Sequence, residues 1–161
     1  MTGVQTCALP ILVQDFAFES STVVYNVSPI GLVQRLPYTG TSWSTNLPSY
    51  DTTTQAAHTI VAVPDGKVLV GAGAEALGAS YMGSYSADKG VTFVLITTPG
   101  IVGHGNEHVI FDVDFKNNAF IYMADDQNSV LGTVYRNTVP SFTRWVDNDM
   151  MSVINGATGI A

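Results

Sequence analysis

The feature that most constrains this chain is a repeat of about 50 residues, a period at which whole supersecondary units recur. Residues 15–25 align without a gap on residues 112–122, so that Asp, Phe and Tyr coincide. A third copy, residues 58–70, lies between them. Each copy has the pattern of a strand, a polar turn and a second strand, and Asp65-Gly66 favours a tight two-residue hairpin. The repeat therefore predicts a chain of successive β-hairpins.

A second hairpin follows each of these first hairpins, and an aromatic residue lies near its end: Trp43, Phe93 and Trp145. Each repeat is therefore a unit of four strands. We expect copies over residues 12–57, 58–107 and 108–161, with little helix, and face-to-face packing through the three aromatic residues. The expected strands lie near residues 12–18, 22–28, 31–36, 41–45, 58–63, 67–72, 80–86, 91–97, 108–114, 119–124, 131–137 and 142–147.

Four-stranded meanders at this period are typical of β-propeller blades. The sequence thus predicts an all-β chain of about three four-stranded antiparallel blades from an incomplete β-propeller, because closed propellers need about four to eight. Such a piece leaves two blade faces uncovered. We therefore expect it to be marginally stable and prone to associate, with the remaining blades of a parent protein as its natural partners.

Charge and hydropathy exclude two classes of partner. Acidic residues outnumber basic ones 13 to 6, and the net charge of −7 repels phosphate backbones and anionic lipid. Nucleic acid is therefore not an expected partner. The longest apolar stretch, residues 91–106, contains Pro99, Gly100, Gly103 and Gly105, whereas a membrane helix needs roughly 20 unbroken apolar residues. We expect no membrane span.

The first eleven residues differ in character from the repeats. Residues 1–11 resemble the in-frame translation of a sequencing adapter, and the alternative is a natural N-terminal arm. On the adapter interpretation residues 1–11 are an artefactual leader that contributes no blade strand, and a signal peptide could have been lost upstream. The only cysteine, Cys7, falls in this leader, so residues 12–161 carry no thiol for a disulfide, a metal or catalysis.

One short motif lies where the third strand of the second copy turns into the fourth. Ser86-Ala-Asp88-Lys-Gly90-Val-Thr92-Phe93 resembles the Asp-box of BNR-type β-propellers, with Phe in the usual Trp position. Asp88 is expected to accept hydrogen bonds from backbone N–H groups of its own turn, and Gly90 to adopt positive φ. Thr92 is expected to start the outer strand and Phe93 to fill the space between neighbouring blades.

The resemblance to Asp-box propellers implies a secreted or cell-surface protein. That family includes sialidases, some endoglucanases and many bacterial exoproteins without an assigned role. In it the Asp-box lies on the face away from the substrate pocket, so the motif is structural and no evidence for catalysis. The corresponding turns before Trp43 and Trp145 keep the aromatic residue but lack the Asp and Gly pattern.

Three further patterns resemble parts of metal, anion-binding or hydrolytic sites. His104 to His108 spells His-x-x-Glu-His, but that zinc motif works only on a helix, and Gly103 and Gly105 flank His104. Arg35, Arg136 and Arg144 lack the motif context of a sialic-acid-binding triad, and a structural role is expected for them. The acidic residues are many, and their spacing selects no pair for glycoside hydrolysis. We therefore assign no catalytic residue, no metal and no cofactor.

Loops at the ends of inner strands lie on the binding face of a propeller, and His58 and His108 occupy similar repeat positions there. The sequence predicts a non-catalytic, extracellular or cell-surface module for binding or surface structure, with a glycan or protein partner. The alternative is a fragment of an Asp-box glycoside hydrolase of sialidase-like or endoglucanase-like type. The candidate ligand-binding residues are His58, His104, Glu107, His108, Asp125, Asp126 and Asn128.

Overall fold

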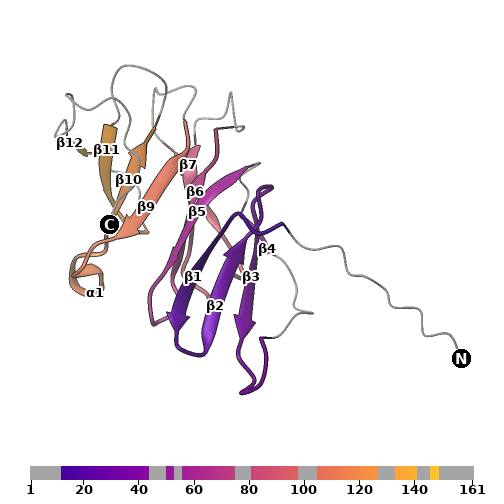
Figure 1. Cartoon of the computed structure of the whole chain (residues 1–161). Helices are drawn as coiled ribbons and strands as arrows, with labels where there is room; N and C mark the ends of the chain where they lie inside the picture. The colour runs from indigo at the N-terminus through magenta and orange to yellow at the C-terminus, as the bar shows by residue number, and fades with distance from the viewer. Residues whose placement is uncertain are drawn as a thin grey trace, which may run out of the picture.

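The computed structural model describes residues 12–43, 50–52, 56–74, 81–97, 105–126, 133–140 and 146–148, and within them the chain is all-β apart from one helical turn (Figure 1). The elements are β1 (Asp15–Ser20), β2 (Val23–Val27), β3 (Leu32–Pro37), β4 (Tyr50–Asp51), β5 (Ala57–Ala62), β6 (Val68–Ala72), β7 (Tyr81–Ser86), β8 (Val94–Thr97), β9 (Glu107–Phe111), α1 (Phe115–Asn118), β10 (Phe120–Asp125), β11 (Thr133–Thr138) and β12 (Val146–Asn148).

The strands form three four-stranded sheets, each a meander in chain order with antiparallel neighbours: β1 to β4 (sheet 1), β5 to β8 (sheet 2) and β9 to β12 (sheet 3). Short turns fix this connectivity because two-residue and glycine-containing loops reverse a chain between antiparallel strands. Gly66 shows this in the β5–β6 turn, with φ of 81°. The prediction of an all-β chain with three antiparallel sheets is confirmed.

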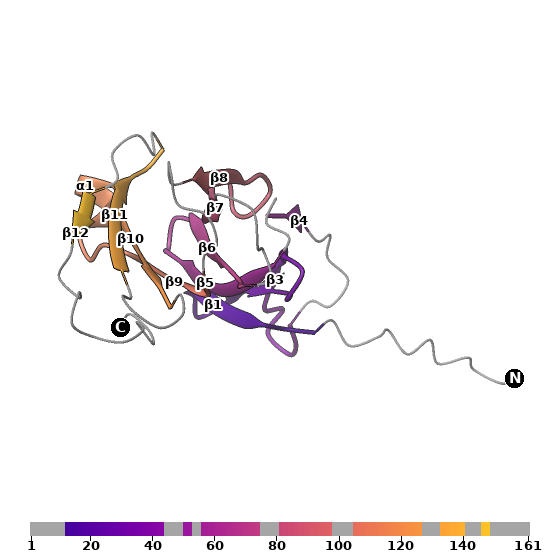
Figure 2. The same cartoon turned by 90° about the horizontal axis from the view of Figure 1, so that it is seen from above.

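The three sheets fan out from one common edge (Figure 2). The first strands, β1, β5 and β9, lie side by side at this edge, whereas β4, β8 and β12 lie at the periphery. Direct bonds join the first strands. The Ile60 N–H donates to Asp15 Oδ2 at 2.9 Å, and the Thr59 hydroxyl donates to the Glu107 carbonyl at 2.8 Å. Successive sheets are therefore bonded as well as packed, and the fan is not closed into a ring.

The middle sheet is packed on both faces. Side chains of β5 and β6 alternate, so that Ile60, Val68 and Val70 point to sheet 1 while Leu69 points to sheet 3. On the sheet 1 side they meet Tyr25 with its neighbours Val27 and Val33. On the sheet 3 side the core adds Met82, Tyr85, Ile96, Val109, Phe111, Phe115, Ile121, Met123, Tyr135 and Val139.

Backbones come unusually close where sheet 2 meets sheet 3. A Cβ atom placed on Gly71 would lie 2.1 Å from the Glu107 carbonyl oxygen, so no larger residue fits there. The glycine thus lets β6 approach the first residue of β9. This contact fixes the start of β9 beside sheet 2.

Eleven of the twelve expected strands overlap a strand of the structure, and the fourth does not. Residues 41–43, the described part of the strand expected at residues 41–45, form no strand: an isolated bridge between Tyr38 and Trp43 closes a small loop there, and the described partner of β3 on this side is β4. Gly40, with φ of 96°, lets that loop reverse. Trp43 contacts Tyr38 and Phe18 of its own sheet, whereas Phe93 packs between sheets 1 and 2 as expected.

The gapless alignment of the first and third copies is wrong over the first strand. Asp15 begins β1, whereas Asp112 follows β9. The reason is α1, a helical turn that lengthens the β9–β10 connection and that the polar sequence Lys-Asn-Asn did not reveal. Tyr25 and Tyr122 do match, since each is paired with an arginine on the third strand, Arg35 and Arg136 respectively.

Some expectations lie outside the described residues. These are the absence of a blade strand in residues 1–11, the packing of Trp145 and the position of Arg144. Within the described part of the chain no helix has the length and apolar character needed to cross a bilayer.

Candidate functional site

Five of the seven candidate residues lie at one end of the fan, which we call the upper end. It is the end at which β1, β5 and β9 begin and β2, β6 and β10 finish (Figure 1). His58 is on β5, Glu107 and His108 open β9, and Asp125 and Asp126 close β10. His104 and Asn128 lie outside the described residues. The antiparallel meander explains this gathering, because it returns the second strand of each sheet to where the first began.

Two histidines from neighbouring sheets meet at the upper end. The rings of His58 and His108 pack edge to face with centroids 4.8 Å apart, and both side chains are half-buried. A β-bulge makes this possible, since the register between β5 and β6 shifts at His58, between Ala57 and Thr59. Bulges commonly redirect a side chain in this way. The contact thus joins the first strands of sheets 2 and 3 at a solvent-accessible position.

The charge balance around His58 favours the neutral imidazole. Burial lowers the pKa of His58, the neighbouring His108 lowers it further, and the carboxylates of Asp126 and Asp15 act in the opposite direction. A neutral imidazole offers one donor and one acceptor nitrogen. His58 can therefore exchange hydrogen bonds with uncharged polar groups such as hydroxyls and amides.

The two aspartates at the end of β10 bind the loop that precedes β9. Asp125 Oδ1 accepts the Gly105 N–H at 2.9 Å, and the Asp126 carboxylate accepts both the backbone N–H and the side-chain amide of Asn106. Asn106 in turn accepts the Ala74 N–H at 3.1 Å from the end of β6. Both carboxylates therefore order the rim of the upper end across sheets 2 and 3, and half-buried Asp126 also reaches its surface.

Glu107 has a different environment from the other candidates. Its side chain is fully buried at the start of β9, and its backbone carbonyl is the group that Thr59 and Gly71 approach. A fully buried carboxylate cannot touch a ligand without rearrangement of the strand. Direct ligand contact by Glu107 is therefore not supported by its position, and His58, His108 and Asp126 form the accessible polar group.

The described side chains at this end offer groups that donate and accept hydrogen bonds. Glycoside hydrolysis requires two carboxylates that face each other across the scissile bond. Here Asp125 and Asp126 are engaged with backbone N–H groups, and Glu107 is buried. Among the residues with described placement, no three His, Cys, Asp or Glu side chains gather in a way that could hold a metal ion.

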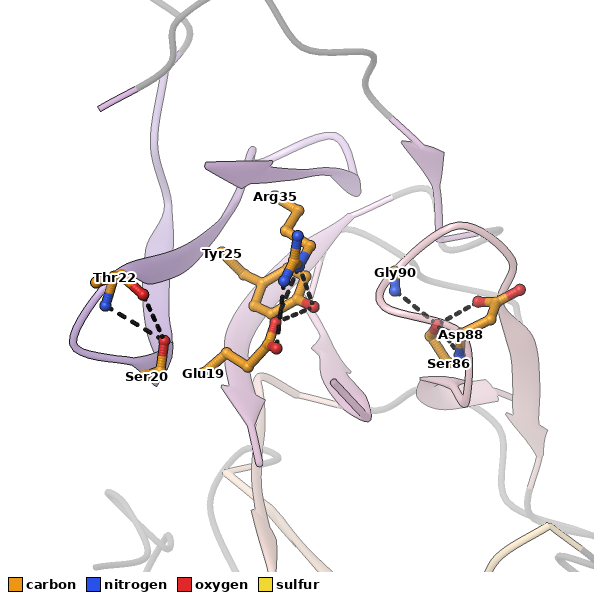
Figure 3. Close-up of polar contacts among 8 residues, drawn as sticks. All are labelled: Glu19, Ser20, Thr22, Tyr25, Arg35, Ser86, Asp88 and Gly90. Carbon is orange, nitrogen blue, oxygen red and sulfur yellow. Dashed lines mark hydrogen bonds and ion pairs between the residues drawn. The ribbon is translucent and has the colours of Figure 1, made fainter. Parts of the chain in front are cut away.

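The turn from residue 86 to 93 lies at the opposite, lower end, where it is held by its own side chains (Figure 3). Ser86 Oγ accepts the Gly90 N–H at 2.9 Å, and Asp88 Oδ1 accepts the Thr92 N–H at 2.8 Å. Gly90 has φ of 76°, so the hydrogen-bonding and backbone roles expected for Asp88 and Gly90 are confirmed. Thr92 does not start the outer strand, which begins at Val94.

Hydrogen bonds also set the charge state of this turn. Burial opposes ionisation of Asp88, but the bonds from Thr92 and Ser86 outweigh it and lower the pKa of Asp88. The carboxylate is thus committed to the turn. This is a structural role and places no reactive group at the lower end.

One polar cluster was missed by sequence reasoning. The Tyr25 hydroxyl donates to Glu19 Oε2 at 2.8 Å, and Arg35 Nε donates to the same oxygen at 2.9 Å (Figure 3). In sheet 3 the Tyr122 hydroxyl donates to Asp112 Oδ2 at 2.8 Å beside Arg136. The equal spacing of both arginines from a preceding glycine was visible in the sequence. The acidic partners were not, because Glu19 lies on the first strand, β1, whereas Asp112 lies in the connection after β9.

A groove of about 690 Å³ lies at the lower end between sheets 2 and 3. Apolar side chains line most of it, among them Val63, Phe115 and Val139, and Lys67 and Lys116 lie at its edge. Lys67 forms an ion pair with Asp65, so it is not free to attract an anion.

No protein-family model matches the chain, and no curated protein sequence matches it. The upper end carries two accessible imidazoles, from His58 and His108, which neighbouring sheets bring into contact.

Proposed function

We propose that this chain is a non-catalytic, extracellular or cell-surface binding module with Asp-box propeller-like blades, and that its upper end binds a glycan or a polar segment of a protein. The observation that carries the proposal is the contact of His58 and His108, half-exposed imidazoles that two separate sheets bring to within 4.8 Å. Half-buried Asp126 adds a carboxylate to the same rim.

A neutral, hydroxyl-rich ligand suits this rim better than an anion. Burial and His108 lower the pKa of His58 overall, but the carboxylates of Asp126 and Asp15 act on it in the opposite direction, which means that their negative charge reaches the site. The whole chain carries a net charge of −7 as well. Both effects oppose a phosphate or a sialic-acid carboxylate, whereas uncharged sugar hydroxyls pair with imidazole and carboxylate groups without this cost.

The blade interpretation is supported by three features of the fold. The sheets are four-stranded meanders, they radiate from the edge of first strands, and residues 86–93 form a self-bonded turn at the far end from the histidines. Four-stranded sheets arranged around a common axis are the architecture of propellers. The Asp-box resemblance would then place the ligand at the upper end, away from the turn.

The test uses the double variant His58→Ala/His108→Ala, with Lys116→Ala at the lower end as the matched control. Binding is measured on an array of neutral and sialylated oligosaccharides and on soluble β-glucans. We expect the wild-type chain to bind a neutral glycan, the double variant to bind at least about tenfold more weakly, and the control to bind unchanged. Equal binding by the double variant, or loss of binding in the control, contradicts the proposal.

The same preparations test the hydrolase alternative. We expect no turnover of sialosides, β-glucans or peptides, because the carboxylates of the upper end are bonded to backbone or buried. Measurable turnover that a single Glu107→Gln change abolishes would replace the binding proposal by a glycoside hydrolase.

A further inference from the structure

The face of sheet 3 that points away from sheet 2 carries a polar row. Ile110, Tyr122 and Arg136 are direct cross-strand partners on β9, β10 and β11, and all three are half-buried. Asp112 accepts the Tyr122 hydroxyl, and the Arg136 guanidinium lies 4.8 Å from the centre of the Phe120 ring. No other described sheet covers this face.

Sheet 1 has the same row, and there it is covered. Ala17, Tyr25 and Arg35 are cross-strand partners, and Glu19 takes the place of Asp112. Sheet 2 buries this row, so that Tyr25 is 0% exposed. The 86–93 turn of sheet 2 takes part, since a Cβ placed on Gly90 would lie 3.3 Å from Tyr25 Cε1.

The other free face belongs to sheet 1. Phe16 and Phe18 point away from sheet 2, and their side chains are 58% and 56% exposed. Their cross-strand partners on β2 are Asn26, which is paired with Phe16, and Val24, which is paired with Phe18; both partners are buried. Sheet 2 uses the corresponding face, with Ile60 and Val68, to cover sheet 1. The face of sheet 1 that carries Phe16 and Phe18 is therefore the counterpart of the face that covers a Tyr–Arg–acid row within the chain.

We propose that the free face of sheet 3 docks onto the free face of sheet 1 in a second copy of this chain. The row of Ile110, Tyr122 and Arg136 would then be covered as Ala17, Tyr25 and Arg35 are covered within one chain. Two copies related by a twofold axis make this contact twice and close a ring of six sheets, within the range of about four to eight that closed propellers contain. A second copy supplies both kinds of face, so that it meets the two free faces of this chain at once.

This inference rests on the stacking of sheets and not on the histidine end, so it can fail while the binding proposal stands. The association is tested with one variant on each face. Phe18→Glu places a charge on the free face of sheet 1, and Ile110→Glu places one on the free face of sheet 3. Val113→Glu is the matched control, because Val113 is a fully exposed apolar residue beside α1 and belongs to neither face.

Sedimentation equilibrium of each full-length chain over a concentration series gives the mass, with circular dichroism to verify folding. We expect wild type and Val113→Glu to reach twice the 17.1 kDa of one chain. Phe18→Glu and Ile110→Glu should each dissociate at least about tenfold more readily, because the added carboxylate would lose its hydration in the contact.

Mixing the two face variants decides which faces meet. In the mixture the intact sheet 3 of the Phe18→Glu chain can dock on the intact sheet 1 of the Ile110→Glu chain, so one of the two contacts is restored. We expect the mixture to form mixed dimers more readily than either variant alone forms dimers. A monomeric wild type, or a dimer that only one of the two substitutions weakens, overturns the proposal.

Discussion

Removal of one hydroxyl from Tyr25 tests whether burial by sheet 2 makes the polar row of sheet 1 stabilising. In Tyr25→Phe the ring stays in the core, but the hydrogen bond to Glu19 at 2.8 Å and the one from Arg35 at 3.1 Å are lost. Hydrogen bonds to charged groups contribute about 1.5–3 kcal/mol each. The direct Arg35–Glu19 bond survives and Arg35 is 30% exposed, so we expect a net loss of about 1–2 kcal/mol.

The register-equivalent change Tyr122→Phe is the internal control. Tyr122 makes the same bond to an acidic partner, Asp112, but on a face that no described sheet covers, so solvent replaces what is lost. We expect a clearly smaller effect than at Tyr25. Both changes are made in the Phe18→Glu chain, which keeps sheet 3 uncovered if the chain associates.

Urea unfolding followed by circular dichroism measures the difference. With a slope of about 1–3 kcal/mol per molar urea, Tyr25→Phe should lower the midpoint by roughly 1 M. The midpoint of Tyr122→Phe should fall much less. An unchanged midpoint for Tyr25→Phe, or an equal fall for both variants, would refute the idea that covering by the next sheet strengthens this row.

Two further predictions concern the backbone contact between sheets and acid stability. Gly71→Ala should destabilise the fold by at least about 3 kcal/mol, because the new Cβ would meet the Glu107 carbonyl oxygen at 2.1 Å. Gly40→Ala is the control and should cost only about 1–2 kcal/mol, because Gly40 has a positive φ but open space around it. Equal unfolding midpoints for the two variants would contradict the predicted difference. Burial opposes ionisation of Glu19, but the hydrogen bonds from Arg35 and Tyr25 outweigh it and lower the pKa of Glu19 in the folded chain. The ionised Glu19 therefore contributes to the free energy of unfolding above the ordinary carboxyl pKa, and this contribution is lost as the pH falls through the pKa of the folded state. Calorimetry of the wild-type chain should therefore show a melting temperature that decreases below about pH 4, and the decrease should be shallower in Glu19→Gln. An identical decrease in both chains would contradict a stabilising role of ionised Glu19.

The fold was largely predictable where strands alternate and turns are short. Asp65-Gly66 marked the β5–β6 hairpin, and its two strands lie within a residue of their expected bounds. The end of β3 was not predictable, because Trp43 has the sequence pattern of a strand residue. Only its isolated bridge to Tyr38 shows that Trp43 closes a small loop instead. Likewise α1 interrupts a polar stretch that has no helical periodicity.

The candidate site was predictable in position more than in role. Placing His58, His108 and Asp126 at one end needed only the meander, which returns each second strand to the start of the first. The burial of Glu107 and the edge-to-face contact of the histidines depend on how tightly sheet 2 packs against sheet 3, through Gly71 and the bulge at His58. Spacing along the chain carries no information about such contacts between sheets.

The chemical difference between the two sheet contacts has a consequence for recombination. Sheet 1 presents Tyr25 and Arg35 to its neighbour, whereas sheet 2 presents Leu69 and Tyr85. If sheet 2 were duplicated in tandem, the face of the first copy that carries Leu69 would pack against the face of the second copy that carries Ile60. In the present chain the Ile60 face packs against the tyrosine and arginine of sheet 1. Genetic shuffling of these units would therefore produce mismatched neighbours, and their order along the gene is itself under structural constraint.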